Sequence, residues 1–210
     1  MDLDPFPWLD ALIILALIAL NGVFAMSELA IVSSRPARLQ AMAEGGSSGA
    51  AAAIHLSKDP GRFLSTVQIG ITLIGIIAGA YSGASLGGPT GERIAQLGLV
   101  SDKWAMNIGF GLVIGATTFA SLVIGELVPK QIALRNPERI ACLVAPAMTL
   151  LAKVAAPIVW FLNRSGKLVL LALGKGGARS DTVTDAEIHS LIAEAESAGV
   201  IEPEERTMIA

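Results

Sequence analysis

The sequence contains little charge, little histidine and almost no cysteine. Of its 210 residues, 16% are charged, whereas a soluble domain carries about 25%. The single cysteine, Cys142, excludes an intrachain disulfide and a cysteine-rich metal site. The two histidines, His55 and His189, lie outside the apolar segments and lack ligand spacing. A net charge of −3 without a basic tract argues against a nucleic-acid partner.

The apolar residues are instead gathered into three long segments, at about 6–32, 63–86 and 104–128. A helix needs roughly 20 apolar residues to cross the hydrocarbon core of a bilayer, and each segment is long enough. The first is preceded by acidic residues and is too long for a signal peptide, so we interpret it as a retained helix. The sequence therefore predicts an all-α membrane protein with three transmembrane helices.

The distribution of basic residues predicts the orientation of these helices. The segment before the first helix has no lysine or arginine, whereas the loop after it holds Arg35, Arg38, Lys58 and Arg62. Because basic loops stay in the cytoplasm, we predict a multi-pass protein of the cell membrane with the N-terminus outside and the C-terminus in the cytoplasm. Trp8 and Trp104 would then lie at the outer interface, which favours indole rings.

Residues 140–173 are apolar but interrupted by prolines and charges. A fourth transmembrane helix here would place Lys153 in the hydrocarbon, at a cost of a few kcal/mol. We therefore expect broken amphipathic helices at the inner surface, with a fourth crossing as the alternative. The interrupting residues are Pro146, Lys153, Pro157, Asn163, Arg164 and Lys167.

The predicted organisation has three parts. Residues 1–137 form the three-helix transmembrane domain, 138–175 a juxtamembrane helical belt on the cytosolic side, and 176–210 acidic cytosolic helices. Thr184 and Glu187 have the spacing of a capping box, and the helix that they open is expected to end near Gly199. A further helix is expected from Glu202, so we expect the protein to continue beyond this sequence.

Each transmembrane segment carries a stripe of polar or small residues. In the first, Asn21 and Glu28 share one face and Ser27 lies beside it. The alternative for Glu28 is that its carboxylate simply reaches the inner surface. In the second, a polar stripe continues into glycines, for which close helix packing is the plainer explanation. That stripe comprises Ser65, Gln68, Thr72, Gly75, Gly79, Gly83 and Gly87.

The third segment carries a small-residue stripe that ends beside Glu126. Pro129 has no N–H, so the carbonyl of Gly125 loses its helical partner, and it lies next to a carboxylate. Such a pair suits a hard cation. The alternative is a proline kink in which Glu126 pairs with Lys130 near the interface. The stripe comprises Gly111, Gly115, Thr118, Ser121 and Gly125.

These polar groups lie at similar depths. Helical rise places Glu28, Thr72 and Glu126 about 10–15 Å inside the inner boundary. The groups offer only oxygen ligands, which suit magnesium, calcium or manganese better than zinc or copper.

Two motifs resemble the CorC/cyclin M (CNNM) family of magnesium transporters. Residues 21–30, Asn-Gly-Val-Phe-Ala-Met-Ser-Glu-Leu-Ala, are similar to that family's first helix. Residues 125–130, Gly-Glu-Leu-Val-Pro-Lys, are similar to its third-helix signature, so the resemblance carries over to Glu126 and Pro129. Residues 182–205 resemble the acidic helices that precede the family's cytosolic pair of CBS domains, which bind ATP and magnesium and are absent from this sequence.

The resemblance implies a dimeric three-helix membrane domain that holds Mg²⁺ among its helices and leaves coupling to sodium open. Three places depart from the family pattern, and at the first of them Asn21 stands where some members have a serine. Ala25 stands where some members have a serine, and Ser27 is the substitute. Ile71 and Thr72 replace an asparagine-containing pair, which makes Thr72 a candidate ligand. The expected metal ligands are Asn21, Ser27, Glu28, Thr72, Gly125 and Glu126.

The expected function is export of magnesium across the plasma membrane, and the expected partners are the bilayer and a second copy bound through the second and third helices. The alternative is a membrane anchor and magnesium sensor that does not transport. An intramembrane enzyme has no support, because the apolar segments offer neither a histidine nor a cysteine, and no serine paired with a base.

Overall fold

The computed structural model describes residues 5–98 and 100–173, and every regular element in that range is helical. The expected linker and acidic helices of residues 176–210, including the capping box at Thr184, lie outside the described residues. The chain divides into two compact units, Met1–Phe161 and Leu162–Ala210.

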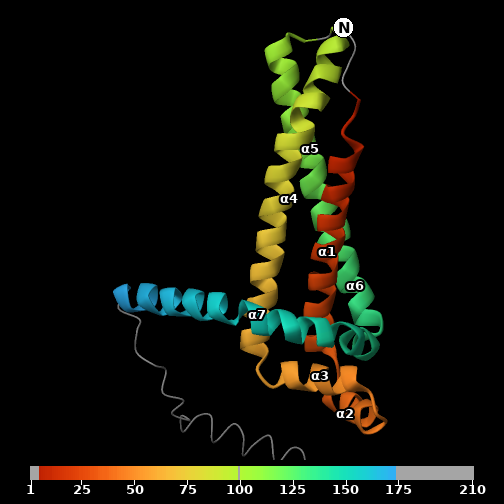
Figure 1. Cartoon of the computed structure of the whole chain (residues 1–210), viewed down its shortest axis with the longest axis vertical. Coiled ribbons are helices and arrows are strands. Elements are labelled where there is room, and N and C mark those ends of the chain that lie inside the picture. The colour runs from red at the N-terminus through yellow and green to blue at the C-terminus, as the bar shows by residue number, and fades with distance from the viewer. Residues whose placement is uncertain (1–4, 99, 174–210) are drawn as a thin grey trace, which may run out of the picture. The chain divides into compact units, whose positions relative to one another are not determined.

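Three long helical segments run side by side in the first unit (Figure 1). They are α1 (Trp8–Ser33), α4 (Pro60–Gln96) and a composite of α5 (Asp102–Leu122), η1 (Val123–Leu127) and α6 (Val128–Arg135). Helix α4 packs against both α1 and α5, while α1 also contacts η1 and α6. Many large apolar side chains on these helices remain exposed, among them Leu12, Ile76 and Phe119. Such exposure suits helices surrounded by lipid rather than water.

Prolines and short polar residues determine where the helices begin. Proline occupies the first turn of α2 (Pro36–Glu44) and of α4, where its missing N–H costs no helical hydrogen bond. Ser47 accepts a hydrogen bond from the N–H of Ala50 and caps α3 (Ser48–Ser57). Asp59 caps α4 in the same way, through the N–H of Arg62 at 3.1 Å.

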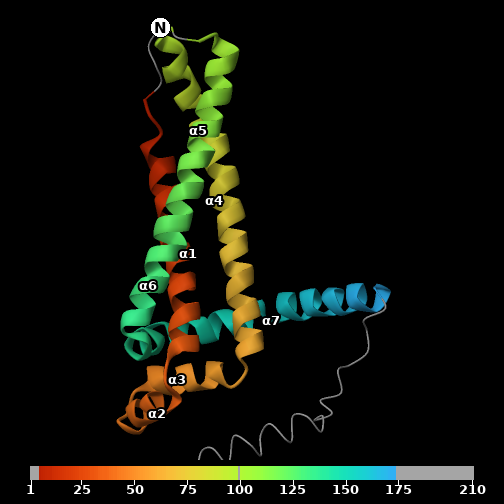
Figure 2. The same cartoon turned by 180° about the vertical axis from the view of Figure 1, so that it is seen from behind.

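The hydrophobic core of the first unit lies at the end of the bundle where α1 stops (Figures 1 and 2). Phe24 and Ile31 of α1, Leu56 of α3, Phe63 of α4 and Met148 of α7 (Pro137–Ala172) belong to one buried cluster. Within this unit, α7 therefore packs across the ends of the long helices instead of extending alongside them (Figure 2).

Two expectations about this region need correction. Residues 137–172 form one continuous helix rather than several broken ones, although it contains Pro146 and Pro157. Each proline removes only one N–H, and both are exposed. Pro146 leaves the carbonyl of Cys142 without its helical donor, and that carbonyl lies directly against Gly49 of α3.

The number of candidate transmembrane helices also differs from the expectation. Among the described residues, four helical segments are long and apolar enough to cross a membrane, rather than three. The fourth is α7 itself. Its continuity explains the difference, because the prolines and charges that were expected to divide it do not interrupt the helix.

Candidate cation site

Helix α1 and the η1 segment approach each other backbone to backbone. A Cβ atom added to Gly22 would lie 3.0 Å from Cγ of Pro129 and 3.3 Å from the carbonyl oxygen of Ile124. A Cβ atom on Gly125 would lie 3.2 Å from both the side-chain amide of Asn21 and the carbonyl oxygen of Ile18. The absence of a side chain at Gly22 and Gly125 is therefore what allows the two helices to meet here.

The η1 segment is a π-helical turn placed directly before Pro129. The N–H of Val128 donates to the carbonyl of Val123, five residues earlier, instead of four. A π turn widens the helix and shifts the following residues, and such turns occur often at functional sites. Because Pro129 supplies no N–H to this turn, the carbonyl of Gly125 is available to a partner outside its own helix.

That partner is Asn21 of α1. Its side-chain Nδ2 donates a hydrogen bond of 3.1 Å to the carbonyl oxygen of Gly125. The Oδ1 atom of the same side chain is buried and finds no hydrogen-bond partner among the described residues. An unsatisfied buried oxygen costs about 1–3 kcal/mol, and a cation bound to it would remove that cost. The structure thus brings together two of the predicted ligands, Asn21 and Gly125.

A second group, of charged residues, is contributed by α1, η1 and α6. The ammonium of Lys130 is 2.8 Å from Oε1 of Glu126 and 3.6 Å from Oε2 of Glu28. All three side chains are partly exposed, with Glu28 at 22% and Glu126 at 36%. The pairing of Glu126 with Lys130 is therefore present, and it extends to Glu28. The three side chains together carry one net negative charge.

Ser27 and Thr72 do not join these two groups. Ser27 is fully buried, and its hydroxyl donates 2.8 Å to the carbonyl of Phe24 within the same helix. Thr72 is exposed, because α4 turns Val67, Ile74 and Ala78 inward at helical spacing and Thr72 lies off that face.

The contact between α1 and α4 at this level is apolar. The ring of Phe24 lies against Gly70, where a Cβ atom would collide with it. Phe24 therefore fills the space between the two helices, and α4 contributes packing instead of an oxygen atom at this depth.

Three features were missed by the sequence analysis. Lys130 was considered only as a partner of Glu126, although it also reaches Glu28 on another helix. Gly22 and the fit of Phe24 to Gly70 had been given no role. The motif itself carried a signal for Gly22, because it lies next to Asn21 in the matched first-helix segment.

Within the described ranges, no three acidic, histidine or cysteine side chains gather into a metal cluster. Any cation held here would therefore depend on neutral oxygens, such as Asn21 Oδ1 and the Gly125 carbonyl, together with at most two carboxylates. That mixture favours a hard cation over zinc or copper.

The described residues form only helices, with several apolar segments and polar groups buried between them, and this arrangement defines a multi-pass helical membrane protein. Residues 12–205 match the model of the cyclin M (CNNM) transmembrane N-terminal domain family. The chain belongs to that family.

Curated relatives agree with this assignment. A UPF0053 protein of Synechocystis sp. is 43% identical over 96% of this chain. The UPF0053 protein YhdT of Bacillus subtilis is 32% identical over 94% of it. A protein of Escherichia coli K12 named polyamine export protein is 27% identical over 94% of it. The chain spans 45%, 43% and 44% of these relatives, which is less than half the length of each.

Proposed function

We propose that the chain exports magnesium ions across the cell membrane and binds them at the junction of α1 and η1. The observation that carries this proposal is the buried, unpartnered Oδ1 of Asn21 beside the π turn. A dehydrated divalent cation needs fixed oxygen ligands, and this atom is held in place because Nδ2 of the same side chain donates a hydrogen bond to the Gly125 carbonyl oxygen. The name of the polyamine export protein supports the outward direction.

In this proposal Lys130 acts as a built-in counter-ion. Its ammonium pairs with both Glu126 and Glu28 while the site is empty, which leaves one net negative charge and lowers the cost of holding carboxylates within the membrane. An arriving cation takes the place of that ammonium at Glu126. When the ion leaves, Lys130 returns, so neither state leaves two carboxylates unpaired. The proposal includes this exchange both with and without coupling to sodium.

A second candidate substrate is an organic polyamine. The observation in its favour is that Glu126 and Glu28 already hold a primary ammonium, that of Lys130, at 2.8 and 3.6 Å. A polyamine presents the same chemical group. The relatives named polyamine export protein are consistent with this alternative.

The membrane arrangement that we propose has three transmembrane helices. Helices α1, α4 and the α5–η1–α6 segment cross the bilayer, while α7 lies along the inner surface, with the N-terminus outside. The exposed Lys153 in the middle of α7 supports a surface position, because a crossing would place its charge in the hydrocarbon. We also propose a homodimer formed through α4 and α5 at Gly75, Gly79, Gly111 and Gly115, beside which the described residues leave open space.

The test is flux from liposomes loaded with magnesium or with spermidine. We expect the unaltered chain to release magnesium, and Glu126→Gln to abolish release because it removes the charge but keeps the shape. Glu92→Gln serves as the matched control, because it neutralises an exposed carboxylate on a different helix, α4. This variant should transport normally.

The possible results separate the competing functions. Release of spermidine without magnesium would establish the second candidate. Magnesium binding without any flux would establish the sensor. Normal magnesium flux by Glu126→Gln would refute the site.

A further inference from the structure

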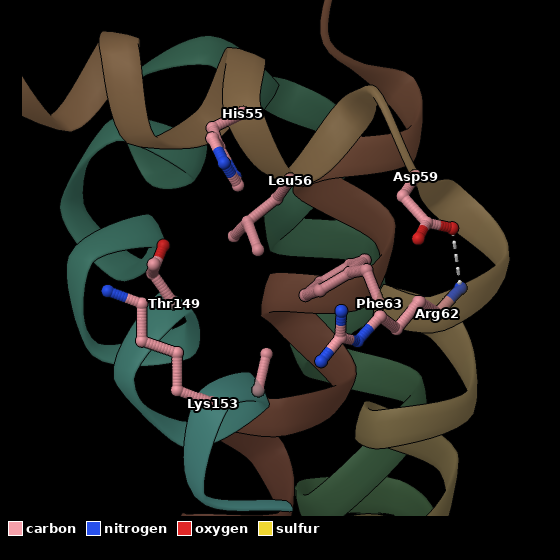
Figure 3. A pocket seen from close by; sticks show the side chains of 8 residues that line it. His55, Leu56, Asp59, Arg62, Phe63, Thr149 and Lys153 are labelled. Carbon is pink, nitrogen blue, oxygen red and sulfur yellow. Dashed lines mark hydrogen bonds between the residues drawn. The ribbon is translucent and has the colours of Figure 1, made fainter. Parts of the chain in front are cut away.

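A pocket with two basic side chains in its lining lies where α3 and the start of α4 meet α7. Its volume is about 210 Å³, and all its lining residues belong to the first unit (Figure 3). In the close-up, the side chain of Arg62 extends into the pocket, and Lys153 lies across from it beside Thr149. The lining residues are His55, Leu56, Asp59, Arg62, Phe63, Thr149, Ala152 and Lys153.

The two basic side chains of this pocket lack acidic partners. Over the described part of the chain, neither Arg62 nor Lys153 makes an ion pair, whereas Lys130 and Arg38 do. The one acidic residue in the lining is Asp59, whose carboxylate accepts the N–H of Arg62 and caps α4. That carboxylate is engaged with the helix end, so the guanidinium and the ammonium are left to bind an external anion.

Part of the lining between these charged groups is apolar. Leu56 is 6% exposed and Phe63 is 2% exposed, and Ala152 adds a further small apolar surface. Charged groups at the rim and apolar side chains at the floor suit an amphiphile, which has a charged head and an apolar tail. They do not suit a fully hydrated ion, which has no apolar part. Thr149 adds a hydroxyl oxygen at the rim, where its proton is donated to the carbonyl of Ala145 at 2.8 Å.

The position of the pocket in the fold indicates where such an amphiphile would come from. It opens at the end of the bundle where α4 begins, which is the end that carries Arg35, Arg38 and Lys58. By the distribution of basic residues this end faces the cytoplasm. The cytoplasmic leaflet is rich in anionic lipids, and basic pockets between helices on that side suit their headgroups.

We infer that this pocket binds the phosphate of an anionic phospholipid from the inner leaflet. Arg62 and Lys153 hold the phosphate from opposite sides, and Leu56 and Phe63 receive the upper part of the acyl chains. Because Arg62 belongs to α4 and Lys153 to α7, the lipid links a transmembrane helix to the surface helix. The inference rests on the proposed orientation but is independent of which ion is transported.

The experiment is lipid binding by the purified chain, measured by native mass spectrometry with phosphatidylglycerol or phosphatidylcholine. We expect retained phosphatidylglycerol and little phosphatidylcholine. Lys153→Gln and Arg62→Gln should each weaken phosphatidylglycerol binding about tenfold. Lys58→Gln, which removes an exposed charge from the same region but outside the pocket, should change it less than twofold. Lys153→Arg should retain binding, because it keeps the charge.

Three results would overturn the inference. Equal loss in Lys58→Gln and Lys153→Gln would mean that only the general charge of this surface matters. Equal retention of phosphatidylcholine would mean that the pocket is an apolar groove without selectivity for an anion. Displacement of phosphatidylglycerol by millimolar inorganic phosphate would identify free phosphate as the ligand. Since no flux is measured, failure here leaves the proposed transport function untouched.

Discussion

At the scale of single residues, Gly22 controls how closely α1 and the π turn approach. Its α-carbon faces the ring of Pro129 and the carbonyl of Ile124, with no room for a further carbon atom. The hydrogen bond from Asn21 to Gly125 depends on this approach, because Asn21 is the neighbour of Gly22. Thus a glycine that carries no chemistry positions the two groups proposed to bind the ion.

We predict that Gly22→Ala destabilises the chain by about 1–3 kcal/mol, the usual cost of overpacking a tight contact. The added carbon would push α1 away from Pro129 and lengthen the Asn21–Gly125 hydrogen bond. Thermal unfolding in detergent should show a lower Tm. Gly88→Ala is the matched control, since an added carbon there meets nothing within 4 Å and Gly88 lies outside the proposed dimer interface. Equal Tm values for the two variants would contradict the packing argument.

At the scale of elements, the π turn is the feature that distinguishes the third long segment from an ordinary helix. It occurs where Pro129 interrupts the helical hydrogen bonds, and it directs the carbonyl of Gly125 towards α1. A regular α-helix would use that carbonyl internally. The proline therefore has a role beyond a kink, because its ring also packs against Gly22.

We predict that Pro129→Ala weakens magnesium binding severalfold, but less than Glu126→Gln does. The new N–H can engage the carbonyl of Gly125 within the helix, which removes one neutral ligand while the carboxylate stays. Isothermal titration with magnesium would measure both variants. Pro157→Ala, at an exposed proline of α7, should bind normally. An unchanged affinity in Pro129→Ala would show that the Gly125 carbonyl is not a ligand.

At the scale of the whole molecule, the first question is how many times the chain crosses the membrane. We predict that cysteines placed at Gly46 and Gln96, in a Cys142→Ala background, label from opposite sides. They lie at the two ends of the bundle, at the α2–α3 turn and at the end of α4. A cysteine at Leu173, after α7, should label from the same side as Gly46 if α7 stays at the inner surface. Labelling of Leu173 from the other side would establish a fourth crossing.

The second question is whether two copies associate. Gly75 and Gly79 of α4 and Gly111 and Gly115 of α5 have space for a carbon atom, so no described residue fills their faces. By contrast, Gly83 and Gly87 are filled by Phe110. Small exposed residues allow close contact between helices in lipid, and the unfilled group is therefore the proposed dimer interface.

We predict that Gly79→Leu and Gly115→Leu convert a dimer into a monomer without unfolding the chain. The added side chains would occupy the surface where the second copy packs. Cross-linking in native-like lipid, followed by mass measurement, would count the copies. Gly88→Leu, at another glycine of α4 with free space, should remain dimeric. A monomeric unaltered chain would refute the interface.

The long apolar segments and the family motifs were recognisable from the sequence because they depend on local composition. A bilayer demands about 20 apolar residues per crossing whatever the packing, so the helices α1, α4 and α5 were predictable. The continuity of α7 was not, because proline weakens a helix without always ending it, and packing of Ala141 and Met148 into the core stabilises the whole of its first part.

The candidate site, like the fold, was predictable from the sequence only in part. The sequence by itself determined that Asn21, Glu28 and Glu126 are polar groups in apolar surroundings, and that Pro129 frees a carbonyl. Only the tertiary structure decided which groups meet: Asn21 with Gly125, and Lys130 with both carboxylates. It also turned Thr72 outward. The physical reason is that close packing sets the relative register of two helices, and here the packing contact is that of Gly22 with Pro129. The spacing of residues along one helix carries no information about such a contact.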